Sequence, residues 1–303
     1  MMRMLQNSLL HAGFVGLALL GLGAPRPAEA APPLPQVDVT GPRPAADGAR
    51  FLSVEDPTVR PGAEARAFAR LTRDPLRWET PQGEELALLS TVAGGHFSLG
   101  LARGPARVAL SLPVHAALAG DRRATGGVIG DPGLDLKLRA VEGAHGGLAA
   151  VGRLTAPLGA VDQAAGSPGW TAEAGLCGRV AAGPAGVGVQ LGWRGLPAAT
   201  PAGDDVLQTT YGDRLRLGLA LGLGQGGPDD PAVAVELLGE RELAEIGADW
   251  RSSPAELGLS GQWSPRPGGP RLLAAGAVGI SAGVGAPLFR LQVGVGARQP
   301  PET

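Results

Sequence analysis

The sequence predicts an all-β fold, a closed transmembrane up-and-down β-barrel of about 12 antiparallel strands. Three observations predict it: stretches in which apolar residues alternate with polar or small ones, connections that are alternately long and short, and an N-terminal export signal. The clearest alternation covers residues 213–223, DRLRLGLALGL, where every odd position from Leu215 is a leucine. A period of two places these leucines on one face of a strand.

The N-terminus has the order of parts found in a secretory signal peptide. Arg3 supplies positive charge, residues 14–22 are apolar, and Ala28, Glu29 and Ala30 form a small-x-small cleavage site. The apolar part is too short to span a bilayer comfortably as a helix, which needs about 20 residues. We therefore predict that residues 1–30 are a signal peptide.

The remaining chain divides into a lead-in and one large domain. Residues 31–50 are rich in Pro, Ala and Gly, which predicts a flexible periplasmic lead-in. Residues 51–303 are predicted to form the outer membrane β-barrel, and we expect residues 51–61 at its start to be partly ordered.

Composition narrows the classes of function. The 50 Gly and 28 Pro disfavour helices, and a net charge of −2 provides no overall field for nucleic acid. Cys177 is the only cysteine, so no internal disulfide is possible and a cysteine-rich metal site is excluded. Because Cys177 lies far from the signal, we do not expect a lipoprotein anchor. We expect no cofactor and no metal.

The alternating stretches predict strands at residues 64–72, 87–101, 106–116, 133–141, 147–156, 171–182, 185–194, 213–223, 231–239, 255–264, 271–281 and 287–297. The connections are long at 73–86, 117–132, 157–170, 195–212 and 240–254, and shorter at 102–105, 142–146, 183–184, 224–230, 265–270 and 282–286. Outer membrane barrels have short turns on one side and long loops on the other. Only the last connection breaks this alternation.

The two faces of these strands differ in polarity. The leucine-rich face is predicted to contact lipid, and the polar face to line the lumen. The lumen-facing charged residues, which are a possible solute path, are Arg107, Lys137, Arg139, Arg153, Arg179, Arg194, Arg214, Arg216, Arg290, Glu173, Glu236 and Glu256, joined by Arg66, Arg70, Glu64 and Asp135. Basic residues exceed acidic ones in this set, which predicts a small, anion-preferring conductance if a water path exists. Side chains fill a barrel of about eight strands, whereas a barrel of about sixteen strands encloses an open channel. A barrel of about twelve strands lies between these sizes, so the sequence leaves both an open and a filled lumen possible.

One stretch has two interpretations. Residues 272–289 contain no charged residue, and by length alone they could span a membrane as a helix. Gly276, Gly279, Gly283 and Pro287 interrupt this stretch. Since Gly and Pro are poor helix formers, we predict two strands joined by a turn.

Several short stretches occur in an order typical of a known family. They are FLSVE (51–55), DPL (74–76), LSLPV (110–114), GDPGLDLK (130–137), LTAPLG (154–159) and GVGAPLFR (283–290). Over nearly all of residues 51–298 the chain resembles the β-barrel domain of outer-membrane-protein-A-like proteins of myxobacterial and related bacteria. GDPGLDLK looks like that family's GLGDP…K strand entry, and LTAPLG looks like its LPTG strand end. GVGAPLFR looks like its closing strand. Barrels of the transporter type are an equally close match.

The resemblance implies an outer membrane barrel that is not an enzyme. The sequence departs from the family because no peptidoglycan-binding domain follows the barrel, so cell-wall tethering is not expected. From residues and resemblance together we predict a structural barrel or a passive, porin-like transporter for small solutes in the bacterial outer membrane. Its expected partners are outer membrane lipids and small solutes. We do not expect it to bind nucleic acid. The sequence does not specify an oligomeric state.

Two rival functions belong to other classes. The first is an outer membrane lipolytic enzyme that uses His96 and Ser98, because alternate residues on one strand face the same way and a Ser–His pair can form a nucleophile. We predict that this pair is only part of a polar lumen strand. The second rival is a soluble, secreted β-protein that binds a ligand or a polysaccharide.

Overall fold

The computed structural model describes residues 52–79, 85–120, 123–160, 165–196, 212–224, 231–243, 253–266, 269–281 and 286–299. The predicted signal peptide (1–30) and lead-in (31–50) lie outside the described residues. No helix in the described ranges is long and apolar enough to cross a membrane.

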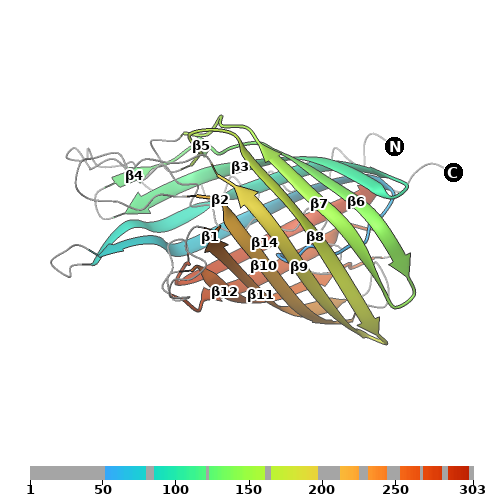
Figure 1. Cartoon of the computed structure of the whole chain (residues 1–303). Helices are drawn as coiled ribbons and strands as arrows, with labels where there is room; N and C mark the ends of the chain where they lie inside the picture. The colour runs from blue at the N-terminus through green and yellow to red at the C-terminus, as the bar shows by residue number, and fades with distance from the viewer. Residues whose placement is uncertain are drawn as a thin grey trace.

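Twelve strands of the described chain form a closed wall in which every neighbouring pair is antiparallel. They are β1 (Gly62–Glu79), β2 (Glu85–Arg103), β3 (Ala106–Gly120), β6 (Gly133–Gly143), β7 (Gly146–Thr155), β8 (Thr171–Ala182), β9 (Ala185–Gly195), β10 (Arg214–Leu223), β11 (Ala232–Glu242), β12 (Ala255–Trp263), β13 (Arg271–Gly279) and β14 (Phe289–Gln299). Each strand pairs with the next along the chain, and β14 returns to pair with β1. Figure 1 shows the strands tilted around the resulting barrel.

The closed, antiparallel barrel of about twelve strands is therefore confirmed. Residues 117–132, expected as a loop, contain the end of β3 and two short strands, β4 (Arg123–Thr125) and β5 (Val128–Ile129), which pair with β3. The uncharged stretch 272–289 forms most of β13 and the start of β14. It is divided between two strands, as its glycines predict.

The barrel has two different ends, which we call the turn end and the loop end. At the turn end, two residues each join β2 to β3, β6 to β7, and β8 to β9. Gly104 and Gly183 begin two of these turns with φ of 58° and 57°, a conformation that tight hairpins require and that glycine adopts without strain. At the loop end, β4 and β5 lie beside the end of β3 (Figure 1). Both Gly62, which begins β1, and Gln299, which ends β14, are at the turn end.

The apolar face of the wall points outward. Along β10, Leu217, Leu219 and Leu221 are 48%, 40% and 57% exposed, whereas Arg216 and Ala220 between them are 8% and 3% exposed. The same alternation appears in the burial of β3, β9 and β11. An apolar outer belt around a polar interior is the pattern of barrels that sit in lipid.

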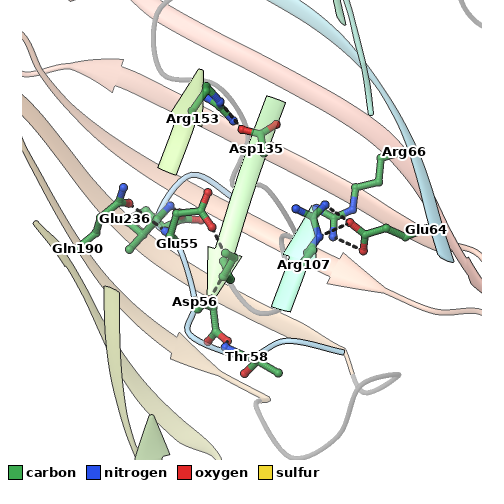
Figure 2. A network of polar contacts seen from close by, with 12 residues as sticks. Glu55, Asp56, Thr58, Glu64, Arg66, Arg107, Asp135, Arg153, Gln190 and Glu236 are labelled. Atoms are coloured by element: carbon green, nitrogen blue, oxygen red, sulfur yellow. Dashed lines mark hydrogen bonds and ion pairs between the residues drawn. The ribbon is translucent and has the colours of Figure 1, made fainter. Parts of the chain in front are cut away.

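Residues 52–61 are not part of the wall, and we call them the plug. They precede β1 and lie inside the barrel, where Leu52, Val54, Asp56 and Val59 are almost fully buried. Gly62 joins the plug to β1 with φ of 125°, in a region that side-chain-bearing residues rarely adopt. Glycine at this position lets the chain turn from the lumen into the wall. The plug runs as a curved segment across the lumen (Figure 2).

Candidate functional site: the charged lumen and its plug

Ion pairs between strands that are adjacent or one strand apart line the loop-end half of the lumen. Arg153 of β7 pairs with Asp135 of β6, and both are buried. Glu173 of β8 lies 3.4 Å from Arg194 of β9 and 3.4 Å from Arg216 of β10. Opposite charges on adjacent strands compensate one another in an enclosed space where water cannot.

The same pattern continues around the wall to β14. Arg214 of β10 lies 3.4 Å from Glu240 of β11, and Glu240 also lies 4.0 Å from Arg216. Arg290 of β14 donates a 2.7 Å hydrogen bond to Glu256 of β12. Glu240 is not among the predicted lumen residues because the strand was predicted to end at residue 239, whereas β11 continues to Glu242.

A cluster of two arginines and one carboxylate occupies the wall near the turn end. Arg107 of β3 donates two hydrogen bonds to Glu64 of β1, one of them 2.9 Å long. Arg66 lies 3.2 Å from the other oxygen of the same carboxylate. Figure 2 shows Glu64 between the two guanidinium groups. Glu64 thus joins β1 to β3 across the intervening β2.

One wall carboxylate binds the start of the plug through its backbone. The amides of Leu52, Ser53 and Val54 donate hydrogen bonds of 2.9, 2.7 and 2.8 Å to Glu236 of β11. Ser260 of β12 donates a further hydrogen bond to the same carboxylate. Three consecutive N–H groups that converge on one anion form a backbone nest. Glu236, predicted as part of a solute path, is therefore the main polar anchor of the plug.

The middle of the plug is acidic and meets basic wall residues. Glu55 lies 2.8 Å from Lys137 of β6, and Lys137 also donates a 2.7 Å hydrogen bond to the carbonyl of Asp56. The Asp56 carboxylate lies 3.4 Å from Arg179 of β8. It also accepts a 2.8 Å hydrogen bond from the Thr58 amide, which closes a local turn.

Two further wall residues hold the backbone of the plug. The Glu55 amide donates a 3.0 Å hydrogen bond to Gln190 of β9, and Arg139 of β6 donates a 3.3 Å hydrogen bond to the Val59 carbonyl. Arg139 also pairs with Glu142 at the turn end.

Apolar contacts also hold the plug against the wall. Val54 packs in a buried cluster with Ala220, Ala234 and Leu238 of β10 and β11. Leu52 packs with Phe68 of β1 and Leu273 of β13. The plug therefore touches strands on opposite sides of the lumen.

All twelve residues predicted to line the lumen are buried or half-buried in the structure. The structure adds three carboxylates that the sequence analysis did not assign to this space: Glu240 of the wall, and Glu55 and Asp56 of the plug. Together with the five assigned from sequence they face eleven basic residues. The excess of positive charge is thus smaller than the wall alone suggests.

A pocket remains between the plug and the loop-end ion pairs. It has about 530 Å³ of space not occupied by atoms, and its lining includes Ser53, Glu55, Arg153, Glu173 and Arg216. Charged groups of both signs therefore surround this space next to the plug.

His96 and Ser98 lie on the lumen side of β2, where both are buried. A lipolytic site must reach lipid, and the outward neighbour on this strand is Phe97, which is exposed. No group of three or more His, Cys, Asp or Glu residues able to hold a metal ion occurs in the described ranges.

Asp131, which stands in the GDPGLDLK stretch, organises the loop end. Its buried carboxylate accepts hydrogen bonds of 2.7 Å from the Gly159 amide and 2.6 Å from the Ser167 amide. It thereby ties the connection between β7 and β8 to the segment before β6. No local pattern in the sequence marks this long-range role.

The closed wall and the apolar outer belt define the class of closed, up-and-down antiparallel β-barrels. A solved outer membrane channel from Pseudomonas putida F1 has a similar fold, with a TM-score of 0.60 and 13% sequence identity over 80% of this chain and 97% of that chain. The translocator domain of the autotransporter NalP from Neisseria meningitidis matches with a TM-score of 0.48 and 17% identity over 78% of this chain and 88% of that one. No family model matches the chain, and no curated protein matches it. The shared feature is the barrel fold, and none of these comparisons supports the particular resemblance to outer-membrane-protein-A-like domains.

Proposed function

We propose that this protein resides in the bacterial outer membrane and lets small solutes cross by passive diffusion, with a weak preference for anions. The observation that carries the proposal is a charged lumen enclosed by a wall whose outer face is apolar. An enclosed polar space is what a hydrophilic solute needs to cross a layer of hydrocarbon. Outer membrane lipids are the partners of the leucine-rich belt.

The anion preference rests on the charge balance of the lumen. Eleven basic side chains of the wall and Arg60 of the plug stand against eight carboxylates, counting the two on the plug. Rings of arginine and lysine favour anions in narrow pores because the field there is poorly screened. The excess is small, so the preference is weak.

Planar-bilayer recording with a potassium chloride gradient tests this function. We expect a small unitary conductance and a reversal potential displaced toward that of chloride. Arg216→Gln, which removes a lumen charge, should reduce the displacement. Arg73→Gln should not, because the Arg73 side chain is 48% exposed at the outer surface. Cation selectivity, or absence of any channel even when the plug is released, would contradict the proposal.

A structural barrel without transport is the second candidate. The plug favours it, since residues 52–61 fill part of the lumen and contact the wall from β1 around to β13. Liposome swelling with small sugars and amino acids separates the two candidates. Swelling no faster than in protein-free vesicles, for the protein and for its plug-released variants, indicates a structural barrel.

Lipid hydrolysis is not favoured, because His96 and Ser98 are buried in the lumen. Phospholipid hydrolysis by the purified protein that is lost in Ser98→Ala would reverse this conclusion.

A further inference from the structure

We propose that the lumen contains a binding site for small organic anions with two carboxylates, and that the plug occupies this site and closes the channel until it is displaced. This inference rests on the proposed function and names both its substrate class and its gate. The site consists of Lys137, Arg139 and Arg179, which all contact the plug.

The plug presents to these residues the groups of a dicarboxylate. Glu55 and Asp56 are adjacent in the chain, and their carboxylates meet Lys137 on β6 and Arg179 on β8. Lys137 is 2% exposed and Asp56 is fully buried, so these ion pairs are shielded from water. Cations held apart on two strands suit a ligand with two separated negative groups.

The plug is built to move as a unit. Residues 52–61 pair with no strand, and they are bound through side chains of the wall rather than through a backbone ladder. Gly62, with φ of 125°, is the point where the segment leaves the wall. A segment without a ladder can leave its place without breaking any pairing between the strands of the wall.

Displacement changes the charge of the lumen in a defined way. When the plug leaves, the carboxylates of Glu55 and Asp56 leave with it, while Lys137, Arg139 and Arg179 stay in the wall. Arg60 of the plug leaves as well, so the lumen becomes more positive by one charge. The channel that opens when the plug leaves should therefore prefer anions.

A reversible disulfide tests the gate. A Cβ placed at Gly218 lies 3.2 Å from Cγ2 of Val54, so Val54→Cys with Gly218→Cys brings two thiols within bonding reach. The native Cys177 is replaced by Ala in this variant. We expect oxidation to abolish the conductance and dithiothreitol to restore it. Val54→Cys with Cys177→Ala but without the second cysteine is the matched control, and it should not respond to oxidation.

Charge removal tests the binding site. Glu55→Gln with Asp56→Asn should raise the conductance and shift the reversal potential further toward that of chloride. Asp213→Asn is the matched control, because this exposed carboxylate contacts Trp193 and Leu196 rather than the plug. In this Glu55→Gln/Asp56→Asn variant, which we call the released variant, succinate should block the chloride current at concentrations where acetate does not. Adding Lys137→Gln and Arg179→Gln should abolish the block.

The outcomes separate this inference from the function on which it rests. If the oxidised, locked barrel conducts as well as the reduced one, the proposed gating role of the plug is contradicted, whereas the proposed channel function is not. If succinate and acetate act alike in the released variant, the dicarboxylate site is wrong. If no variant conducts while all migrate on gels as folded barrels, the channel function itself fails. Conductance that follows the redox state, with a succinate block lost in Lys137→Gln/Arg179→Gln, supports the whole proposal.

Discussion

Glu236 shows how a single side chain can position a whole segment. Its buried carboxylate accepts hydrogen bonds from three consecutive amides of the plug and from Ser260. Charged acceptors make stronger hydrogen bonds than neutral ones, and a nest of three donors distributes the negative charge. The contact therefore explains why an otherwise irregular segment has one defined place in the lumen.

Glu236→Ala should release the start of the plug. Each buried N–H left without a partner costs about 1–3 kcal/mol, and three amides lose their acceptor in this variant. We expect faster hydrogen exchange at residues 52–54, measured by mass spectrometry, with the wall strands unchanged. Ser260→Ala is the control, since it removes only the wall's own bond to this carboxylate. Equal exchange rates in both variants would show that Glu236 does not hold the plug.

The ion pair of Asp135 with Arg153 should behave as a coupled unit. Both residues are buried, so removing one partner leaves a charge uncompensated, which typically costs about 3–5 kcal/mol. We expect Asp135→Asn to lower the free energy of unfolding in urea by more than the double change Asp135→Asn/Arg153→Gln. Additive effects of the two single changes would mean that the pair is not coupled.

At the scale of the element, β10 illustrates how alternation sets the two environments of a strand. Its leucines are exposed to the outside, while Arg216, Gly218 and Ala220 are buried against the lumen side. Gly218 has a specific role, because a Cβ there would come within 3.2 Å of Val54 in the plug. The absence of a side chain at Gly218 makes room for the plug.

Leu219→Arg should destabilise the barrel in a way that depends on depth in the membrane. Leu219 lies in the middle of β10 on the outer face, where an arginine in lipid costs about 2–4 kcal/mol. Leu223→Arg, at the turn end of the same strand, should cost only about 0–1 kcal/mol because the interface is near. Urea unfolding from phospholipid vesicles measures both. Equal costs would indicate that this face does not contact hydrocarbon.

The wall could be predicted from the sequence because alternation is a local signal. Each strand shows its two faces within about ten residues, and the short turns are marked by Gly104 and Gly183. Strand ends were predicted less well, and Glu240 was missed for that reason. Alternation fades near the rim, where both faces become accessible to water.

The plug could not be predicted in the same way. Residues 52–61 have no periodicity, and their order comes from contacts distant in the chain, such as the hydrogen bond from Leu52 to Glu236, 184 residues away. The sequence did place Lys137, Arg179 and Glu236 on the lumen face. It could not show that their partners are supplied by the segment before β1, because a single sequence contains no signal for such pairing.

At the scale of the whole molecule, closure depends on one seam. β1 and β14 pair over eleven residue positions, from Ala63 with Gln299 to Arg73 with Phe289. The seam removes the two free strand edges that lipid would not tolerate. Without β14, β1 and β13 would each expose unpaired backbone groups.

Removal of the last strand should therefore abolish the folded barrel. A chain that ends at residue 288 lacks β14 and should migrate identically on gels whether or not it is boiled. A chain that ends at Gln299 keeps the seam and should migrate differently when folded and when boiled. A heat-dependent shift in the shorter chain would show that the barrel closes without β14.

The seam also fixes the order of events during assembly. Its two halves come from opposite ends of the domain, so ring closure cannot precede synthesis of the final residues. Until then the sheet is an open ribbon with two unpaired edges, and unpaired strand edges favour aggregation. Closure of the barrel is consequently a step that waits for β14, and the plug is enclosed when the edges of β1 and β14 meet.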